Sequence, residues 1–237
     1  IAPDFLPDRV LEGHQGLIWK PAFSPDGRMI ATAACWEGKV RVWDVENGNC
    51  HQTLTTGGIV SPVVWSADGN RVIVTTSEGH LHSLVVWDWR LDRIEQTIEL
   101  PNSNADAAGM GIAVSPDDCC VALSYRQGRI VLCDLQSEAV LADQAISRDS
   151  IFLMQFLQEG ACLVVAAFDS MVRFLAVPTL SEQQSIEIPN LEWCELLPNG
   201  DVLAVCKNVA GAIDCHVTLY DGTTAEAKMV VTDGSSA

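Results

Sequence analysis

Two short markers recur along the 237-residue chain at one shared period. Copies of the first, a four-residue turn signal, start 42, 49, 42 and 40 residues apart, and the steps of the second are 44, 46, 42 and 45 residues. A self-similar period of this length is typical of repeat proteins. The turn signals start at Ser24, Ser66, Ser115, Leu157 and Leu197, and the second markers are Trp43-Asp44, Trp87-Asp88, Cys133-Asp134, Leu175-Ala176 and Tyr220-Asp221.

Two markers with one period predict five copies of one unit, over residues 11-54, 55-100, 101-147, 148-188 and 189-231. The pattern within a unit is strand-like. Residues 39–43 alternate polar and apolar side chains, which indicates a half-buried strand, and residues 28–34 are an apolar run after a turn. Residues 135–147 allow a helix, but their place after Cys133-Asp134 favours a loop and a strand. Each unit therefore predicts about four short strands and an all-β fold.

The first unit contains Gly13-His14, then 28 residues, then Trp43-Asp44, with Ser24-Pro25-Asp26-Gly27 as an intervening turn. This pattern resembles the WD40 repeat, and the resemblance extends over residues 11–231 with decreasing specificity. It implies one WD40-type β-propeller domain over residues 1-237, made of four-stranded blades with short protected edges. We expect at least five blades within a larger propeller of about seven. Residues 1-10 would be the outer strand of a preceding or closing blade, and residues 232-237 a tail.

In WD40 repeats a loop His, a strand Ser or Thr, a turn Asp and a strand Trp form a buried hydrogen-bond chain. The resemblance assigns His14 and Trp43 to two of these roles in the first unit. It puts Ala33 at the hydroxyl position and Glu37 at the turn carboxylate.

The later units match this chain only in part. The second unit keeps Thr75 and Trp87 but has Gly57-Gly58 in place of Gly-His, and the fourth keeps Asp169. We therefore expect that no unit contains all four groups and that apolar packing between sheets stabilises the blades.

The chain carries 31 acidic and 14 basic side chains, a formal net charge of -17. Such a surface repels phosphate backbones and anionic lipid headgroups, so we expect no nucleic acid and no membrane partner. Protein partners with basic segments would be favoured, although the same charge also serves solubility.

The nine cysteines are an odd number without any C-x-x-C pair, and several lie in apolar runs. This usage indicates a reducing compartment, the cytoplasm or the nucleus. The longest apolar run, residues 161–168, is too short to span a bilayer.

Motifs for chemistry are missing from the sequence. There is no phosphate-binding glycine loop and no nucleophile elbow. His80-x-His82 and the group Cys206, Cys215 and His216 match no common zinc spacing. We therefore predict no catalytic residue, no metal and no cofactor.

Carboxylates in the inner turns leave an alternative open. Glu37, Glu78 and Asp169 could line a central axis as a hydrolase would require, or could stand in for the structural turn Asp.

Large side chains recur at two positions of the repeat. Aligned on their turns, the units bring Trp19, Met110 and Phe152 to the start of the first strand, with Trp193 one residue away. The residue before each turn carboxylate is Trp36 or Phe168 in two units and Arg126, beside Tyr125, in a third. In WD40 propellers both positions face the top surface, where aromatic and Met side chains suit an interface core. The alternative is packing between blades.

These observations predict a protein–protein interaction scaffold, a subunit or module of a larger assembly that binds partners through its top face. Two alternatives remain: a regulatory or sensor propeller of a large multidomain signalling protein, and a propeller hydrolase with axial carboxylates.

Overall fold

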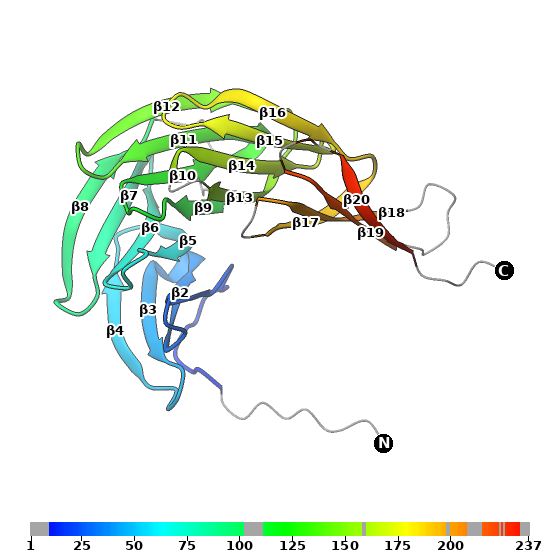
Figure 1. The fold of residues 1–237 in the computed structure, drawn as a ribbon. Coiled ribbons are helices and arrows are strands. Elements are labelled where there is room, and N and C mark those ends of the chain that lie inside the picture. The colour runs from blue at the N-terminus through cyan, green and yellow to red at the C-terminus, as the bar shows by residue number, and fades with distance from the viewer. Residues whose placement is uncertain are drawn as a thin grey trace, which may run out of the picture. The chain divides into compact units, whose positions relative to one another are not determined.

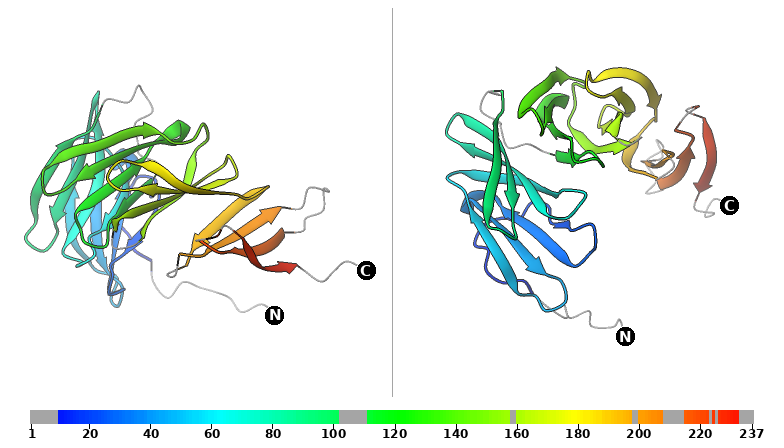
Figure 2. Two further views of the ribbon diagram at one scale, coloured as in Figure 1. Left: turned by 45° about the horizontal axis from the view of Figure 1, so that its top comes forward. Right: turned by 60° about the vertical axis from the view of Figure 1, so that its left-hand side comes forward.

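The computed structural model describes residues 10–101, 111–157, 160–197, 200–207, 215–222, 224 and 226–232. Within these residues twenty strands form five four-stranded antiparallel sheets, and the strands of each sheet follow chain order (Figures 1 and 2). We call the sheets blades 1 to 5 in chain order. The described helical elements are two short 3-10 turns, so the all-β propeller prediction is confirmed.

The contacts divide the chain into two compact units, Ile1–Ala108 and Gly109–Ala237. The first unit holds blades 1 and 2. Its elements are β1 (Ala22–Phe23), β2 (Met29–Ala34), η1 (Cys35–Glu37), β3 (Lys39–Asp44) and β4 (Cys50–Thr55), then β5 (Ile59–Trp65), β6 (Arg71–Glu78), β7 (Leu81–Asp88) and β8 (Arg93–Glu99).

The second unit holds blades 3, 4 and 5. Blade 3 contains β9 (Gly111–Val114), β10 (Cys120–Ser124), η2 (Arg126–Gly128), β11 (Arg129–Asp134) and β12 (Ala139–Ala145). Blade 4 contains β13 (Ile151–Leu157), β14 (Cys162–Ala167), β15 (Met171–Ala176) and β16 (Ser181–Glu187). Blade 5 contains β17 (Leu191–Leu196), β18 (Val202–Lys207), β19 (Cys215–Tyr220) and β20 (Ala227–Thr232). Residues 135–147 include strand β12, as the sequence favoured.

The repeated turn signal forms a repeated hydrogen-bonded turn. The Ser24 hydroxyl donates to Asp26 Oδ1 at 2.6 Å and accepts the Met29 amide at 2.9 Å, while the Gly27 amide donates to the Ser24 carbonyl. Blades 2 and 3 repeat these bonds from Ser66 and Ser115. The turn therefore sets the register of the first two strands in three blades.

The core lies between neighbouring blades, and small side chains of one sheet meet large side chains of the next. In the first unit, Ala31 and Ala33 of β2 share a core with Trp65 and Trp87 of blade 2. In the second unit, Val164 of β14 shares a core with the blade 5 side chains. Strand β14 is buried along its whole length, as expected for a strand covered on both faces.

The fourth strand of each blade is its most exposed strand, and in blades 1, 2 and 4 it is largely polar. In β4, for example, only Leu54 is buried. A register shift interrupts the pairing of the third and fourth strands in all five blades. Such bulges increase the local twist of a sheet, and edge bulges discourage pairing with another chain.

The substitution Ala31→Leu tests the small-to-large packing. Ala31 is fully buried, so the larger side chain should overpack the core and lower the free energy of unfolding by about 1–3 kcal/mol. Urea unfolding measures this, with Ala139→Leu, an exposed position at the start of β12, as the control. Equal urea midpoints for Ala31→Leu and the wild type would show that the core between blades 1 and 2 has space for a larger side chain.

Candidate functional site

The contact residues predicted from sequence that the structure describes come from one end of the sheets. Because neighbouring strands are antiparallel, the start of the first strand lies beside the end of the second and the turn that follows it. We call this end the site end. Trp19 and Trp36 lie there in the first unit, and Phe152, Phe168 and Trp193 in the second.

A bulge in the first strand of a blade turns side chains outward at the site end. In blade 4, Ile151 pairs with Ala167 and Leu153 with Ala166, so Phe152 is the extra residue. In blade 5, Leu191 pairs with Cys206 and Trp193 with Val205, so Glu192 is the extra residue. Bulges re-aim side chains in this way.

Three aromatic side chains of the second unit form a continuous row, which we call the aromatic row. Phe152 stacks on Trp193 with ring centroids 5.7 Å apart, and Phe168 lies 5.0 Å from Phe152 on the other side. Phe168 is 60% exposed and Trp193 is 52% exposed. The structure thus brings together three residues that the sequence predicted from two different repeat positions.

The first unit also presents large apolar side chains at this end. Trp36, in η1, is 77% exposed, and Trp19 is half-exposed. Leu17 and Ile18 precede Trp19 and are exposed as well. The Cys35 amide donates to the Leu17 carbonyl at 3.0 Å, which holds this segment beside the Trp36 turn.

The partly buried carboxylate of Glu37 anchors the turn that carries Trp36. Glu37 Oε2 lies 2.9 Å from His14 Nδ1 and accepts the Gln15 amide at 3.1 Å, and its Oε1 contacts Lys39 and Arg41. Burial alone would raise the pKa of Glu37, but the hydrogen bonds from His14, Lys39 and Gln15 lower that pKa from 4.5 to about 2. Glu37 is therefore a charged structural anchor directly beside the exposed Trp36.

The same carboxylate ends a complete four-group chain in blade 1. His14 Nε2 lies 2.7 Å from Thr32 Oγ1, and Trp43 Nε1 donates to Thr32 Oγ1 at 2.7 Å. Trp can only donate and the carboxylate can only accept. Neutral His14 protonated on Nδ1 satisfies every group, because it donates to Glu37 and accepts from the Thr32 hydroxyl.

The expectation that no unit contains all four groups is therefore wrong, and Ala33 is not the hydroxyl position. Trp43 pairs with Ile30, and Thr32, two residues along β2, shares that face. Ala33 pairs with Val40 on the opposite face. A shift of one residue along a strand exchanges its two faces.

Blade 2 needs the same correction. Trp87 pairs with Val72, so Val74 occupies the place that Thr32 holds in blade 1. The Thr75 hydroxyl instead donates to the Ser61 carbonyl on the other face, and Trp87 Nε1 donates to Asp92 Oδ1 at 3.3 Å.

Blade 4 repeats the anchor in reduced form. Asp169 follows Phe168, accepts the Ser147 hydroxyl at 2.8 Å and contacts Arg173 through both oxygens. Burial raises the pKa of Asp169, but the bonds from Arg173 and Ser147 outweigh burial and lower it. In both blades the anchored carboxylate directly follows an exposed aromatic residue.

Three further predicted residues have different outcomes. Tyr125 is only 4% exposed and packs beneath the Arg129 guanidinium, so its assignment to the contact surface is wrong. Burial also raises the pKa of Tyr125. Arg126, in η2, is exposed at the site end, and its contact with a partner stays a prediction. Met110 lies outside the described residues, as does the predicted outer strand except for Val10.

Sequence reasoning missed the arginines that hold the anchored turns. Arg41 and Arg173 each follow the carboxylate by four residues, at the same place in two units. That shared spacing was a usable signal. Sequence reasoning also missed Glu192, because the neighbouring Trp193 fits the apolar pattern of the strand. Only the bulge in β17 shows that Glu192 is the residue without a pairing partner on β18.

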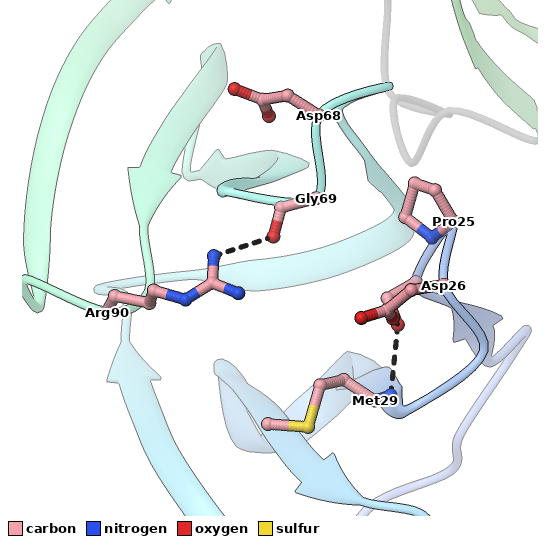
Figure 3. Close-up of a pocket in the computed structure, with 7 residues that line it drawn as sticks. Pro25, Asp26, Met29, Asp68, Gly69 and Arg90 are labelled. Atoms are coloured by element: carbon pink, nitrogen blue, oxygen red, sulfur yellow. Dashed lines mark hydrogen bonds between the residues drawn. The ribbon is translucent and has the colours of Figure 1, made fainter.

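A small hollow of the first unit lies at the opposite end of its sheets (Figure 3). Turn residues of blades 1 and 2, among them Asp26 and Asp68, surround about 90 Å³ of space. Arg90 donates to the Gly69 carbonyl at 3.1 Å and to Asn70 at 2.6 Å. Ligand pockets usually hold about 300–1,000 Å³, so this hollow is a structural junction.

Among the described residues, no group of three His, Cys, Asp or Glu side chains is placed to hold a metal ion. His82 is buried and His80 is exposed, and the side chains of Cys215 and His216 lie outside the described set. The eight described cysteines are free thiols. None of the described helices has the length and apolar character that a membrane span requires.

Comparisons with known proteins agree with this architecture. The family model "WD domain, G-beta repeat" matches residues 6–44. Eukaryotic translation initiation factor 3 subunit I of Pyricularia oryzae is 35% identical over 82 residues, 34% of this chain and 24% of the relative. Its counterpart from Scheffersomyces stipitis is 32% identical over 112 residues, 43% of this chain and 32% of the relative. WD repeat-containing protein AAC3 of Dictyostelium discoideum is 34% identical over 71 residues, 30% of this chain and 15% of that protein.

Among solved structures, the β-propeller domain of Cps50 (Swd1) from Myceliophteria thermophila matches with a TM-score of 0.70 and 17% identity, covering 96% of this chain and 76% of that domain. This likeness shows the fold. The chain spans about a quarter to a third of the translation-factor relatives. The WD40 repeat model thus matches the first unit, and the five four-stranded sheets with the likeness to a solved propeller show a β-propeller fold.

The four-group chain of blade 1 predicts the effect of Thr32→Val. This nearly isosteric change leaves Trp43 Nε1 and His14 Nε2 without their shared partner, and Trp43 is buried. The free energy of unfolding should fall by about 1–3 kcal/mol. Chemical denaturation measures it, with Thr55→Val on exposed β4 as the control. Equal losses in both variants would contradict a special role for Thr32.

The lowered pKa of Glu37 predicts an acid-dependent loss of stability. A carboxyl whose pKa is lower in the folded state stabilises the fold above its unfolded pKa of 4.5. That contribution is lost as pH falls from about 4.5 toward 2. Unfolding free energies measured across this range should fall less steeply for Glu37→Gln than for the wild type. Parallel pH profiles would show that Glu37 is not a significant acid-sensitive anchor.

Proposed function

We propose that the chain is a non-catalytic protein-interaction scaffold, a WD-repeat subunit or module of a larger assembly that works in the cytoplasm or nucleus. Its partners are proteins, bound at the site end through Trp36 and Trp19 in the first unit and through the aromatic row with Arg126 in the second. Neither nucleic acid nor a membrane surface is part of the proposal, because the net charge of -17 repels both.

The observation that carries this proposal is the exposure of aromatic side chains on turns that are themselves anchored. Trp36 is 77% exposed while the adjacent Glu37 is held by four groups, and Phe168 beside Asp169 repeats the arrangement. A rigid exposed aromatic residue loses little conformational entropy on binding, which suits an interface anchor.

The relatives support an assembly role. Two of them are subunit I of eukaryotic translation initiation factor 3, and a subunit is by definition part of a larger assembly. Extending that role to this chain is part of the proposal, since the chain covers only a part of each relative.

The hydrolase alternative fits the described side chains less well. Glu37 and Asp169 are each committed to an arginine and to a turn, and both have lowered pKa values. A general acid needs a raised pKa. Their structural role therefore accounts for both carboxylates.

We also propose that these five blades belong to a propeller of about seven. Phe23 of blade 1 is 63% exposed, whereas Trp65, at the same repeat position in blade 2, is 5% exposed. Trp65 is covered by the blade 1 core, so Phe23 presents the kind of face that a further blade would cover.

The substitution Trp36→Ala should weaken binding of a captured protein partner by about 2 kcal/mol or more, because exposed aromatic anchors dominate interfaces. The experiment titrates a partner purified by its retention on the wild-type chain and checks unfolding in parallel. Leu91→Ala is the control, since Leu91 is also strongly exposed but lies in the turn between β7 and β8. A folded Trp36→Ala variant with unchanged affinity would remove Trp36 from the site.

A further inference from the structure

The two ends of the second unit's site surface differ in charge. Arg126 lies in η2, which packs against β13, so the side toward blade 3 carries a positive group. Trp193 lies on β17, and the exposed Glu192 and Glu195 are on the same strand. The Trp193 end of the aromatic row therefore lies beside carboxylates.

Glu195 lies on the same face of β17 as Trp193. Trp193 pairs with Val205 and Glu195 pairs with Leu203, two residues apart on both strands. Positions two apart along a strand are separated by roughly 7 Å. An exposed indole ring and an exposed carboxylate are thus within reach of one planar cation.

The fold already places arginines over aromatic rings in its interior and on its surface. Guanidinium carbons lie 5.8 Å from the Trp43 ring, 4.5 Å from the Trp89 ring and 5.3 Å from the Tyr125 ring. These three pairs show that a guanidinium group over an aromatic ring suits the surroundings that this fold provides.

We infer that the Trp193 end of the aromatic row receives an arginine side chain from an extended segment of a protein partner. The guanidinium would stack on the Trp193 ring and pair with the Glu195 carboxylate, while apolar neighbours in the segment cover Phe152 and Phe168. Arginine fits better than lysine because its planar group stacks on rings and is more weakly hydrated. The net charge of -17 favours the approach of a basic segment. This inference rests on the proposed function and specifies the chemistry of its partner.

The test begins with selection of random linear peptides on the immobilised whole chain. A selected peptide is then synthesised with its arginine intact or replaced by lysine, and fluorescence anisotropy gives its affinity for four proteins. These are the wild type, Trp193→Ala, Glu195→Gln and Leu141→Ala, where Leu141 is an exposed apolar residue of outer strand β12. Glu195→Gln changes an exposed side chain, so it keeps the test independent of any folding defect in Trp193→Ala.

The expected result is a selected set with arginine enriched at one position. Replacement by lysine, Trp193→Ala and Glu195→Gln should each weaken binding, by roughly three- to thirty-fold, and Leu141→Ala should not. Selected peptides that need the aromatic row but tolerate lysine or an apolar residue would overturn this inference and leave the proposed function standing. Peptides that bind equally to wild type and Trp193→Ala, or no selected peptide at all, would count against both.

Discussion

Burial of both faces of a four-stranded sheet is the constraint on which the rest of this structure depends. Once neighbouring blades cover the two faces, the second and third strands have no surface left for partners. The size of their side chains then determines how closely neighbouring sheets pack. Ala31 and Ala33 face Trp65 and Trp87 for this reason. Side chains that contact a partner can then lie only where the sheet is irregular, at strand starts, bulges and turns. The predicted contact residues that are exposed come from those places.

The irregular turns need additional stabilisation, and the partly buried carboxylates of Glu37 and Asp169 provide it. The blade 1 turn is held by Glu37 through a histidine, a lysine, an arginine and a backbone amide. In blade 4, Asp169 is held by an arginine, a serine and the Met171 backbone amide. Blade 2 has lost the strand hydroxyl, since Val74 stands in place of Thr32, and its Trp87 turns to Asp92. The polar network is therefore optional from blade to blade, while the apolar packing is present in both units.

The sequence predicted the fold well because two markers and the alternation of apolar residues are properties of short segments. It predicted Trp36, Phe152, Phe168 and Trp193 as contact residues from their place in the repeat; Trp36, Phe168 and Trp193 are exposed, whereas Phe152 is half-buried. The sequence prediction was wrong where a shift of one residue along a strand decides which face of the sheet a side chain occupies. The repeat pattern puts Ala33 at the hydroxyl position, which Thr32 occupies in the structure. It also predicts that Tyr125 is a surface residue beside Arg126, but Tyr125 is buried. Bulges and turns set those registers, and their lengths differ between units by single residues that the periodic pattern does not specify.

Charge and aromatic contact contribute to different stages of partner binding at this surface. The net charge of -17 acts at a distance and raises the rate at which a basic segment arrives, but salt screens exposed charges beyond about 8 Å. In the proposed complex, stacking on Trp193 and burial of Phe152 and Phe168 act only at contact and so would determine how slowly the segment leaves. Added salt should therefore reduce association more than it speeds dissociation, whereas loss of a ring should do the reverse. The two contributions can be separated because strands β13 and β17 and the anchored Asp169 turn hold the three rings whether or not a partner is near.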